Sequence, residues 1–213
     1  MRPDPARPDA ARPDAKLSFP TSRLRTLTDG IFAIAMTVMA LELTAGVRED
    51  LELGEMWVVL WPRLVAFALS FGILGLFWIG HLIALEAATQ GDASGEEPRL
   101  TTRGHLVSSL LFLFWIALIP FPAALIGTHP DEPVSFVVYG AVLTLAAVSL
   151  ELSWWMRRDV VSSVAGQSLS RRLLLVILAY LGSAALAFVN PYAALAAFAV
   201  SHIAFTLRPV LKA

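Results

Sequence analysis

The feature that most constrains this chain is a series of apolar runs, each close to the length that crosses a lipid bilayer. A membrane helix needs about 20 mostly apolar residues, because the hydrocarbon core is about 30 Å thick. Of the 213 residues, 57% are hydrophobic and only 15% are charged, whereas a soluble domain has about 25% charged residues. The sequence therefore predicts an all-α, polytopic membrane protein.

Six runs are predicted to form transmembrane helices within one membrane domain, residues 22–213. Pro120 and Pro122 are expected to kink the third helix near its end. The last two runs are close to the minimum length for crossing, so a re-entrant hairpin is the alternative there. The six predicted spans are residues 22–44, 56–88, 104–126, 134–156, 173–189 and 192–207.

The first 21 residues differ in composition from the rest of the chain. Three imperfect five-residue repeats begin with Arg-Pro-Asp, at Arg2, Arg7 and Arg12. Proline at this density opposes helix formation, and the segment has too few apolar side chains to order itself. Residues 1–21 are therefore expected to be a disordered tail. A polar linker through Gln167 and Ser170 is expected before the fifth span.

Basic residues are concentrated on one side of the predicted topology. Of the 16 Lys and Arg residues, all but Arg48 and Arg63 fall on the side of the N-terminus. The positive-inside rule therefore places both termini in the cytoplasm and the protein in the cell membrane. The opposite loops are mainly acidic, which would concentrate cations there. Simple avoidance of positive charge in translocated loops explains the same pattern.

The first span carries polar groups that suggest a function. An ionised side chain at membrane depth is costly, so Asp29 is a candidate functional residue. It could equally cap the N-terminus of the helix or pair with Arg23. One stripe of the helical net could line a pore. The stripe contains Asp29, Ala33, Ile34, Thr37 and Leu41.

Two residues of the second span are expected to approach the start of the first. Trp78 and His81 are three residues apart and share a helix face. His81 follows Trp57 by about 36 Å of helix, which brings it to the depth of Asp29. A cluster of Arg23, Thr28, Asp29, Trp78 and His81 is therefore plausible, although a buried histidine is more often a packing residue.

The sequence gives little support for an enzyme. It contains no cysteine, and its four histidines lack carboxylate partners at ligand spacing, so no metal site is predicted. No catalytic triad or phosphate-binding glycine loop is present, and neither a cofactor nor a nucleic-acid partner is expected. The carbonyl filter sequence TVGYG is also absent, so any ion selectivity must come from side chains.

Residues 23–43 resemble the signature helix of the transmembrane protein 175 family of potassium channels. The family pattern reads Arg-x-x-x-Phe-Ser-Asp, followed by an apolar run. Its four named positions are occupied here by Arg23, Leu27, Thr28 and Asp29, so leucine replaces phenylalanine and threonine replaces serine. The later Trp78 and His81 pair and the six-span layout add to the resemblance.

The resemblance implies a potassium-selective, leak-type channel in the lipid bilayer, with the first helix lining the axial pore of a homotetramer. It further implies an apolar constriction at Ile34 and Leu41, with Thr37 contributing to selectivity. The alternative for Thr37 is a hydroxyl bonded to the Ala33 carbonyl, and the alternative for Ile34 and Leu41 is helix packing. A structural bracing role is implied for Arg23, Leu27, Thr28, Asp29, Trp78 and His81. Two alternatives stay open: a weakly selective cation or proton channel, and a non-conducting transporter or scaffold.

Overall fold

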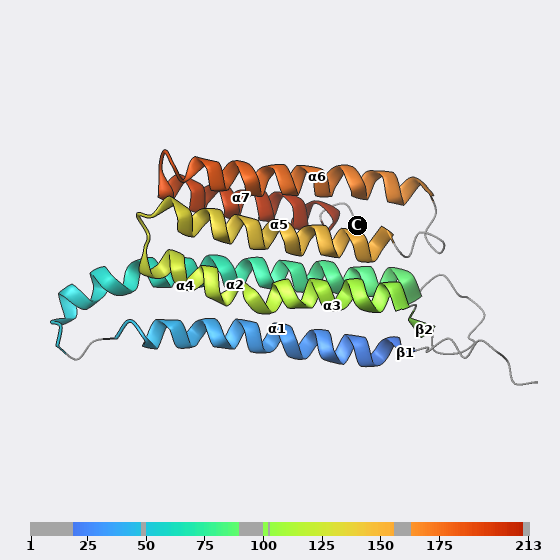
Figure 1. Cartoon of the computed structure of the whole chain (residues 1–213), viewed down its shortest axis with the longest axis horizontal. Helices are drawn as coiled ribbons and strands as arrows, with labels where there is room; N and C mark the ends of the chain where they lie inside the picture. Colours follow the sequence, from blue (N-terminus) through green and yellow to red (C-terminus); the bar gives the residue numbers. More distant parts are fainter. Residues whose placement is uncertain (1–18, 48–49, 90–99, 102, 156–162, 211–213) are drawn as a thin grey trace, which may run out of the picture.

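The computed structural model describes residues 19–47, 50–89, 100–101, 103–155 and 163–210 (Figure 1). These residues form seven α-helices and one pair of two-residue strands. The predicted all-α class is therefore confirmed. Of the predicted tail, residues 1–18 lie outside the described residues, and the next three form the first strand and the start of the first helix.

The first two helices are α1 (Thr21–Thr44) and α2 (Leu53–Thr89). They run antiparallel and pack directly against each other (Figure 1). α2 begins three residues before the predicted span and contains Pro62. Proline is tolerated there because neighbouring groups can satisfy the backbone carbonyl it leaves free.

The predicted third span is divided into α3 (Arg103–Leu118) and α4 (Pro120–Thr128). The division falls at Ile119, whose amide bonds the carbonyl of Ile116 in a tighter turn. Pro120 and Pro122 supply no N–H groups for the helix ladder, which explains the break. The predicted kink is confirmed, and the two helices together remain long and apolar enough to cross a membrane.

The remaining helices are α5 (Pro133–Trp155), α6 (Ser163–Leu186) and α7 (Pro191–Val210). α6 begins ten residues before the predicted start, so the expectation of a polar linker up to residue 172 was wrong. The reason is that an apolar run marks only the membrane part of a helix, and Ser, Gln and Arg can continue a helix beyond it.

Four helical stretches of the described residues are long and apolar enough to cross a membrane, which indicates a multi-pass membrane protein. They are Ser22–Thr44, Leu53–Leu82, Gly104–Thr128 and Pro133–Ser153. Within α6 and α7 the described apolar stretches are shorter, Leu174–Leu186 and Pro191–Ser201. Successive passes alternate in direction, so the start of α1 and the end of α7 lie toward the same end of the bundle (Figure 1).

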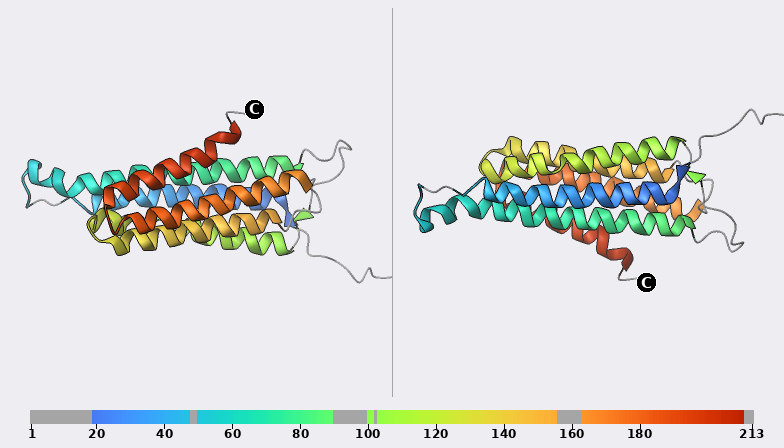
Figure 2. Two further views of the ribbon diagram at one scale, coloured as in Figure 1. Left: turned by 90° about the horizontal axis from the view of Figure 1, so that it is seen from above. Right: turned by 90° about the horizontal axis from the view of Figure 1, so that it is seen from below.

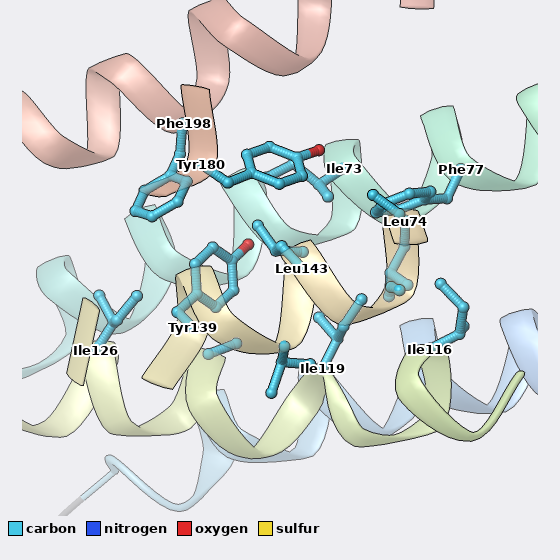
Figure 3. Close-up of a cluster of buried hydrophobic side chains, with 14 of the residues drawn as sticks. Ile73, Leu74, Phe77, Ile116, Ile119, Ile126, Tyr139, Leu143, Tyr180 and Phe198 are labelled. Carbon is cyan, nitrogen blue, oxygen red and sulfur yellow. The ribbon is translucent and has the colours of Figure 1, made fainter. Parts of the chain in front are cut away.

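The core is formed mainly by α2 to α7, while α1 lies at the margin of the bundle against α2, α3 and α4 (Figures 1 and 2). Figure 3 shows aliphatic side chains of α2, α3 and α5 packed with aromatic rings of α5, α6 and α7. A buried hydrogen bond of 2.9 Å joins the hydroxyls of Ser70 and Tyr139 across α2 and α5. The marginal position of α1 leaves one of its faces uncovered.

A short strand pair holds the chain just before α1. β1 (Phe19–Pro20) pairs antiparallel with β2 (Leu100–Thr101), which precedes α3. The strand pair links the residues just before α1 to the residues just before α3, at the end of the bundle where both helices begin.

Candidate functional site

α1 has a packed face and an uncovered face. The packed face repeats every three or four residues, as expected for one side of a helix against a core. It consists of Leu24, Thr28, Phe32, Ala35 and Met39, all of which are buried. Large apolar residues on other sides of the same helix are exposed in the single copy, so the structure leaves a full-length helical surface without a cover from the described part of this chain.

The three residues predicted to line a pore lie on the uncovered face. Ile34 is 63% exposed and Leu41 is 64% exposed, and Thr37 between them is also exposed. The two apolar positions are seven residues apart, which is about 10.5 Å along a helix. Along the axis of α1, the uncovered face therefore carries two apolar side chains, Ile34 and Leu41, with the Thr37 hydroxyl between them.

The Thr37 hydroxyl is bonded to its own helix. Its Oγ1 lies 2.9 Å from the Ala33 carbonyl oxygen and 3.0 Å from the Ile34 carbonyl oxygen. A bond from the hydroxyl to the Ala33 carbonyl is the alternative to a role in selectivity that the sequence left open for Thr37. The hydroxyl donates its proton to the backbone and retains oxygen lone pairs, so the bond orients the oxygen without using up its capacity to accept.

Near the start of α1, Asp29 is bonded to α2. The indole Nε1 of Trp78 donates a hydrogen bond of 2.9 Å to Oδ1 of Asp29. A bond to an ionised carboxylate is stronger than one between neutral groups. It links two residues 49 positions apart and fixes the register of α1 against α2. We call this contact the inner brace.

Two other hypotheses for Asp29 were wrong. α1 begins at Thr21, so Asp29 lies two turns inside the helix and is not its N-terminal cap. Among the described residues, the partner of its carboxylate is Trp78 rather than the exposed Arg23. A spacing of six residues turns an α-helix by about 240°, which places the arginine on a different side of the helix from Asp29.

The other predicted cluster members are divided between buried and exposed positions. Thr28 is buried and bonds the Leu24 carbonyl oxygen at 2.9 Å. His81 is buried and stacks on Phe112 of α3, with 5.4 Å between ring centroids. Leu27, like Arg23, is exposed. The structure thus brings Asp29 and Trp78 into direct contact and places Thr28 and His81 in the packed interior.

A second contact, which the sequence reasoning missed, holds the other end of α1. Nη1 of Arg63 in α2 donates a hydrogen bond of 3.1 Å to the main-chain oxygen of Glu42. The last carbonyls of a helix lack partners within the helix, and a cation there also complements the helix dipole. We call this contact the outer brace. An arginine inside an apolar run was the signal that could have identified it.

Two glycines make room for the outer brace. A Cβ on Gly46 would lie 2.7 Å from Cδ of Arg63, and a Cβ on Gly127 would lie 3.1 Å from its Cα. Both distances are shorter than ordinary carbon contacts. A small cavity of about 20 Å³ adjoins the arginine, and its lining includes Met39, Glu42, Phe67 and Gly127.

A sequence model of one family of membrane channels matches the part of the chain that contains the inner brace, the outer brace and the uncovered face of α1. The family is TMEM175, described as the endosomal/lysosomal potassium channel TMEM175, and its model matches residues 23–120. Residues 23–120 match the model of the TMEM175 family. The resemblance drawn from the signature helix is thereby confirmed, and the TMEM175 family consists of ion channels rather than enzymes.

Two relatives that are named as potassium channels agree with this match. A potassium channel of Streptomyces collinus is 26% identical over 142 residues, and one of Chamaesiphon minutus is 27% identical over 140 residues. Each alignment covers 63% of this chain, and 63% and 64% of the respective relatives, so the chain matches somewhat less than two thirds of their length.

A solved structure covers more of the chain. It is the crystal structure of a lysosomal potassium-selective channel TMEM175 homolog from Chamaesiphon minutus, with a TM-score of 0.69 and 25% sequence identity. The superposition covers 88% of this chain and 97% of that one. The fold likeness therefore extends beyond residue 120 into the later helices.

Proposed function

We propose that this chain is a subunit of a potassium-selective, leak-type channel of the cell membrane, and that the uncovered face of α1 lines its pore. The observation that carries the proposal is that face itself, where Ile34, Thr37 and Leu41 are exposed on a helix of membrane-spanning length. The relatives named as potassium channels and the similar channel structure support the choice of ion.

A pore along α1 requires several copies. One helix cannot enclose an axial pathway, and the chain contains a single copy of the Thr-Asp-Gly segment at Thr28. α1 lies at the margin of the bundle, so the uncovered faces of several copies can meet on a symmetry axis (Figure 2). We take the number as four, as the family resemblance implies, with six spans per subunit.

Ile34 and Leu41 form the closed levels of this pore. Four branched side chains that meet on an axis leave no room for a hydrated ion and no polar atoms to replace its water. Such a constriction closes a pore by excluding water from it. The two levels lie about 10.5 Å apart along α1, so each can exclude water on its own.

Thr37 provides the polar level between them. Four hydroxyl oxygens, each oriented by its bond to Ala33, can partly replace the water lost by a permeating cation. Potassium loses its water more easily than sodium, so an incomplete replacement favours potassium. The braces act on structure rather than on conduction, because they hold α1 against α2 at both of its ends.

Both termini are proposed to lie in the cytoplasm, on the basis of the basic-residue distribution. A single cysteine in this cysteine-free chain tests the orientation. A cysteine in place of Asp131, which is exposed between α4 and α5, should react with an impermeant maleimide added to intact cells. Reaction only after permeabilisation would reverse the orientation.

Ion flux into liposomes tests the function. The purified full-length protein should carry potassium faster than sodium down a gradient without an energy source. Comparable potassium, sodium and proton fluxes would favour the weakly selective cation or proton channel. No flux from a protein that remains oligomeric would favour a transporter or scaffold, and would refute the proposed channel.

A further inference from the structure

Arg23 is a charged residue of α1 that neither brace uses. It lies in the first turn of the membrane-spanning stretch Ser22–Thr44, and its side chain is exposed. Among the residues that the structure describes, none forms a hydrogen bond or an ion pair with its guanidinium, and the carboxylate of Asp29 is bonded to Trp78 instead. An ionised side chain within a membrane span is a candidate functional group.

The helical net fixes the side of α1 on which Arg23 lies. Leu41 follows Arg23 by 18 residues, which is about five complete turns, so the two side chains leave the helix on the same side. Ile34 follows by 11 residues and is only about 20° away. Leu24 and Thr28 are buried on the packed side, about 100° and about 140° around the helix from Arg23. Arg23 therefore belongs to the uncovered face.

The depth of Arg23 places it at one mouth of the proposed pore. It lies about 16.5 Å from Ile34 along α1, at the end of the span that the proposed orientation puts in the cytoplasm. Several copies of α1 that present the uncovered face to a common axis also present Arg23 to that axis. Because the residue lies at the end of the span, its long side chain can keep the charge in water, which limits the cost of bringing the copies together.

Anionic lipid headgroups are the main competing partner for this arginine. The cytoplasmic leaflet is negatively charged and attracts basic residues close to its surface. Arg25 provides a comparison, since it is exposed on the same turn but lies about 200° around the helix from Arg23. The two arginines share depth and charge and differ in direction, and only Arg23 has the direction of Ile34 and Leu41.

We propose that the copies of Arg23 form a ring of positive charge at the inner mouth of the pore, which limits the outward flow of potassium. The proposal rests on the proposed function for the arrangement of copies around α1. Rings of acidic side chains favour cations in a pore and rings of basic side chains favour anions, so a basic ring is a barrier in a potassium pathway. Charge of one sign around a narrow mouth changes the local ion concentration, and here it lowers that of potassium.

The salt dependence of the current tests the ring in the unsubstituted, full-length channel. Potassium current is recorded in excised inside-out membrane patches, with the potassium concentration at the inner face held constant. Adding N-methyl-D-glucamine chloride to that face screens the ring, because the screening length falls from about 30 Å at 0.01 M to about 3 Å at 1 M salt. We expect the outward current to rise several-fold. Screening of anionic headgroups has the opposite sign, so a fall or an unchanged current would overturn the ring.

An exchange of charge at one position gives a second measurement. The chain contains no cysteine, so Arg23→Cys introduces a single thiol. Reaction from the inner face with negatively charged 2-sulfonatoethyl methanethiosulfonate should raise the outward current several-fold, and the positively charged 2-trimethylammonioethyl reagent should lower it. Arg25→Cys is the matched control and should change little. Equal responses from the two variants would indicate a general surface charge and overturn the ring. An unaltered current in Arg23→Cys that mass spectrometry shows to be modified would overturn it too.

The outcomes separate this proposal from the proposed function. A potassium current that Ile34→Asn increases, but that neither the salt nor the reagents at position 23 alter, would overturn the ring and leave the channel standing. No potassium current from the unsubstituted chain would overturn the proposed function and the ring with it. If Arg23→Cys does not assemble, the salt dependence of the unsubstituted channel decides the question alone.

Discussion

The two ends of α1 are held by different chemistry. At the inner brace, two side chains meet in one hydrogen bond between Trp78 and Asp29 at a partly exposed position. At the outer brace, Arg63 reaches a main-chain oxygen through a gap that depends on Gly46 and Gly127. A hydrogen bond near the surface tolerates adjustment, whereas a contact fitted between glycines does not. The outer end should therefore be the less tolerant of substitution.

The largest effect is expected at Gly127. A valine there would place its Cβ 3.1 Å from the Cα of Arg63, a main-chain atom, so α2 and α4 would have to separate. Overpacking of this kind costs about 1–3 kcal/mol or more. The temperature at which the purified protein loses its gel-filtration peak should fall clearly. Gly182→Val is the control, because no atom lies within 4 Å of its Cβ position. An equal loss of thermal stability in Gly182→Val would contradict the steric explanation.

The next effect is expected at Arg63 itself. Arg63→Ala removes the donor to the Glu42 carbonyl, and a hydrogen bond to a charged group is worth about 1.5–3 kcal/mol. Gly46→Val should cost a similar amount, because its Cβ would collide with the flexible Cδ and Nε of the same side chain.

A double-mutant cycle sharpens this prediction. Gly46→Val should cost less once Arg63 is alanine, since the two nearest atoms are gone and only Leu60 Cδ2, 3.1 Å from the Cβ position, remains close. Gly127→Val should keep much of its cost in the same background, because its collision with the Cα persists. Additive losses for Gly46→Val and Arg63→Ala would contradict the geometry of the outer brace. Thermal stability in detergent measures all four proteins of each cycle.

A smaller effect is expected at the inner brace. Asp29→Ala removes the acceptor of the Trp78 indole, at a cost of about 1 kcal/mol for a single hydrogen bond. Recovery of oligomer in detergent should fall before ion preference changes, and Asp29→Asn, which keeps an acceptor oxygen, should recover most of the loss. Normal assembly with altered ion preference would instead assign Asp29 to the permeation path.

The contrast between the ends also shows what the sequence can reveal. Apolar runs predicted the helices because burial in lipid is a property of a segment alone, and the cost of an acid at membrane depth pointed to Asp29. Trp78 was correctly expected near Asp29, because the helix rise brings the two residues to the same depth. The predicted ion pair with Arg23 was wrong, because closeness in sequence does not place two side chains on the same side of a helix. The role of Arg63 was missed because Gly46 of the α1–α2 connection and Gly127 of α4 come together around it only through packing.

The sequence predicted the membrane-spanning parts of the helices better than the parts that extend beyond them. The start of α6 and the first three residues of α2 lie beyond the predicted apolar spans. Composition identifies the part of a helix that contacts lipid, but a helix continues until backbone hydrogen bonding is interrupted. The uncovered face of α1 was found from its stripe of residues, whereas no pattern in one sequence indicated which side of the helix packs.

Ion flux through substituted α1 tests the central claim, that this face lines the pore. Ile34→Asn should admit water to the constriction, raise cation flux into liposomes and lower the preference for potassium over sodium. Thr37→Ala should lower that preference with less effect on flux. Leu178→Asn, a matched polar substitution on the exposed side of α6, should change neither. If both α1 variants remain oligomeric and conduct with unaltered flux and selectivity, the uncovered face of α1 does not line the pore.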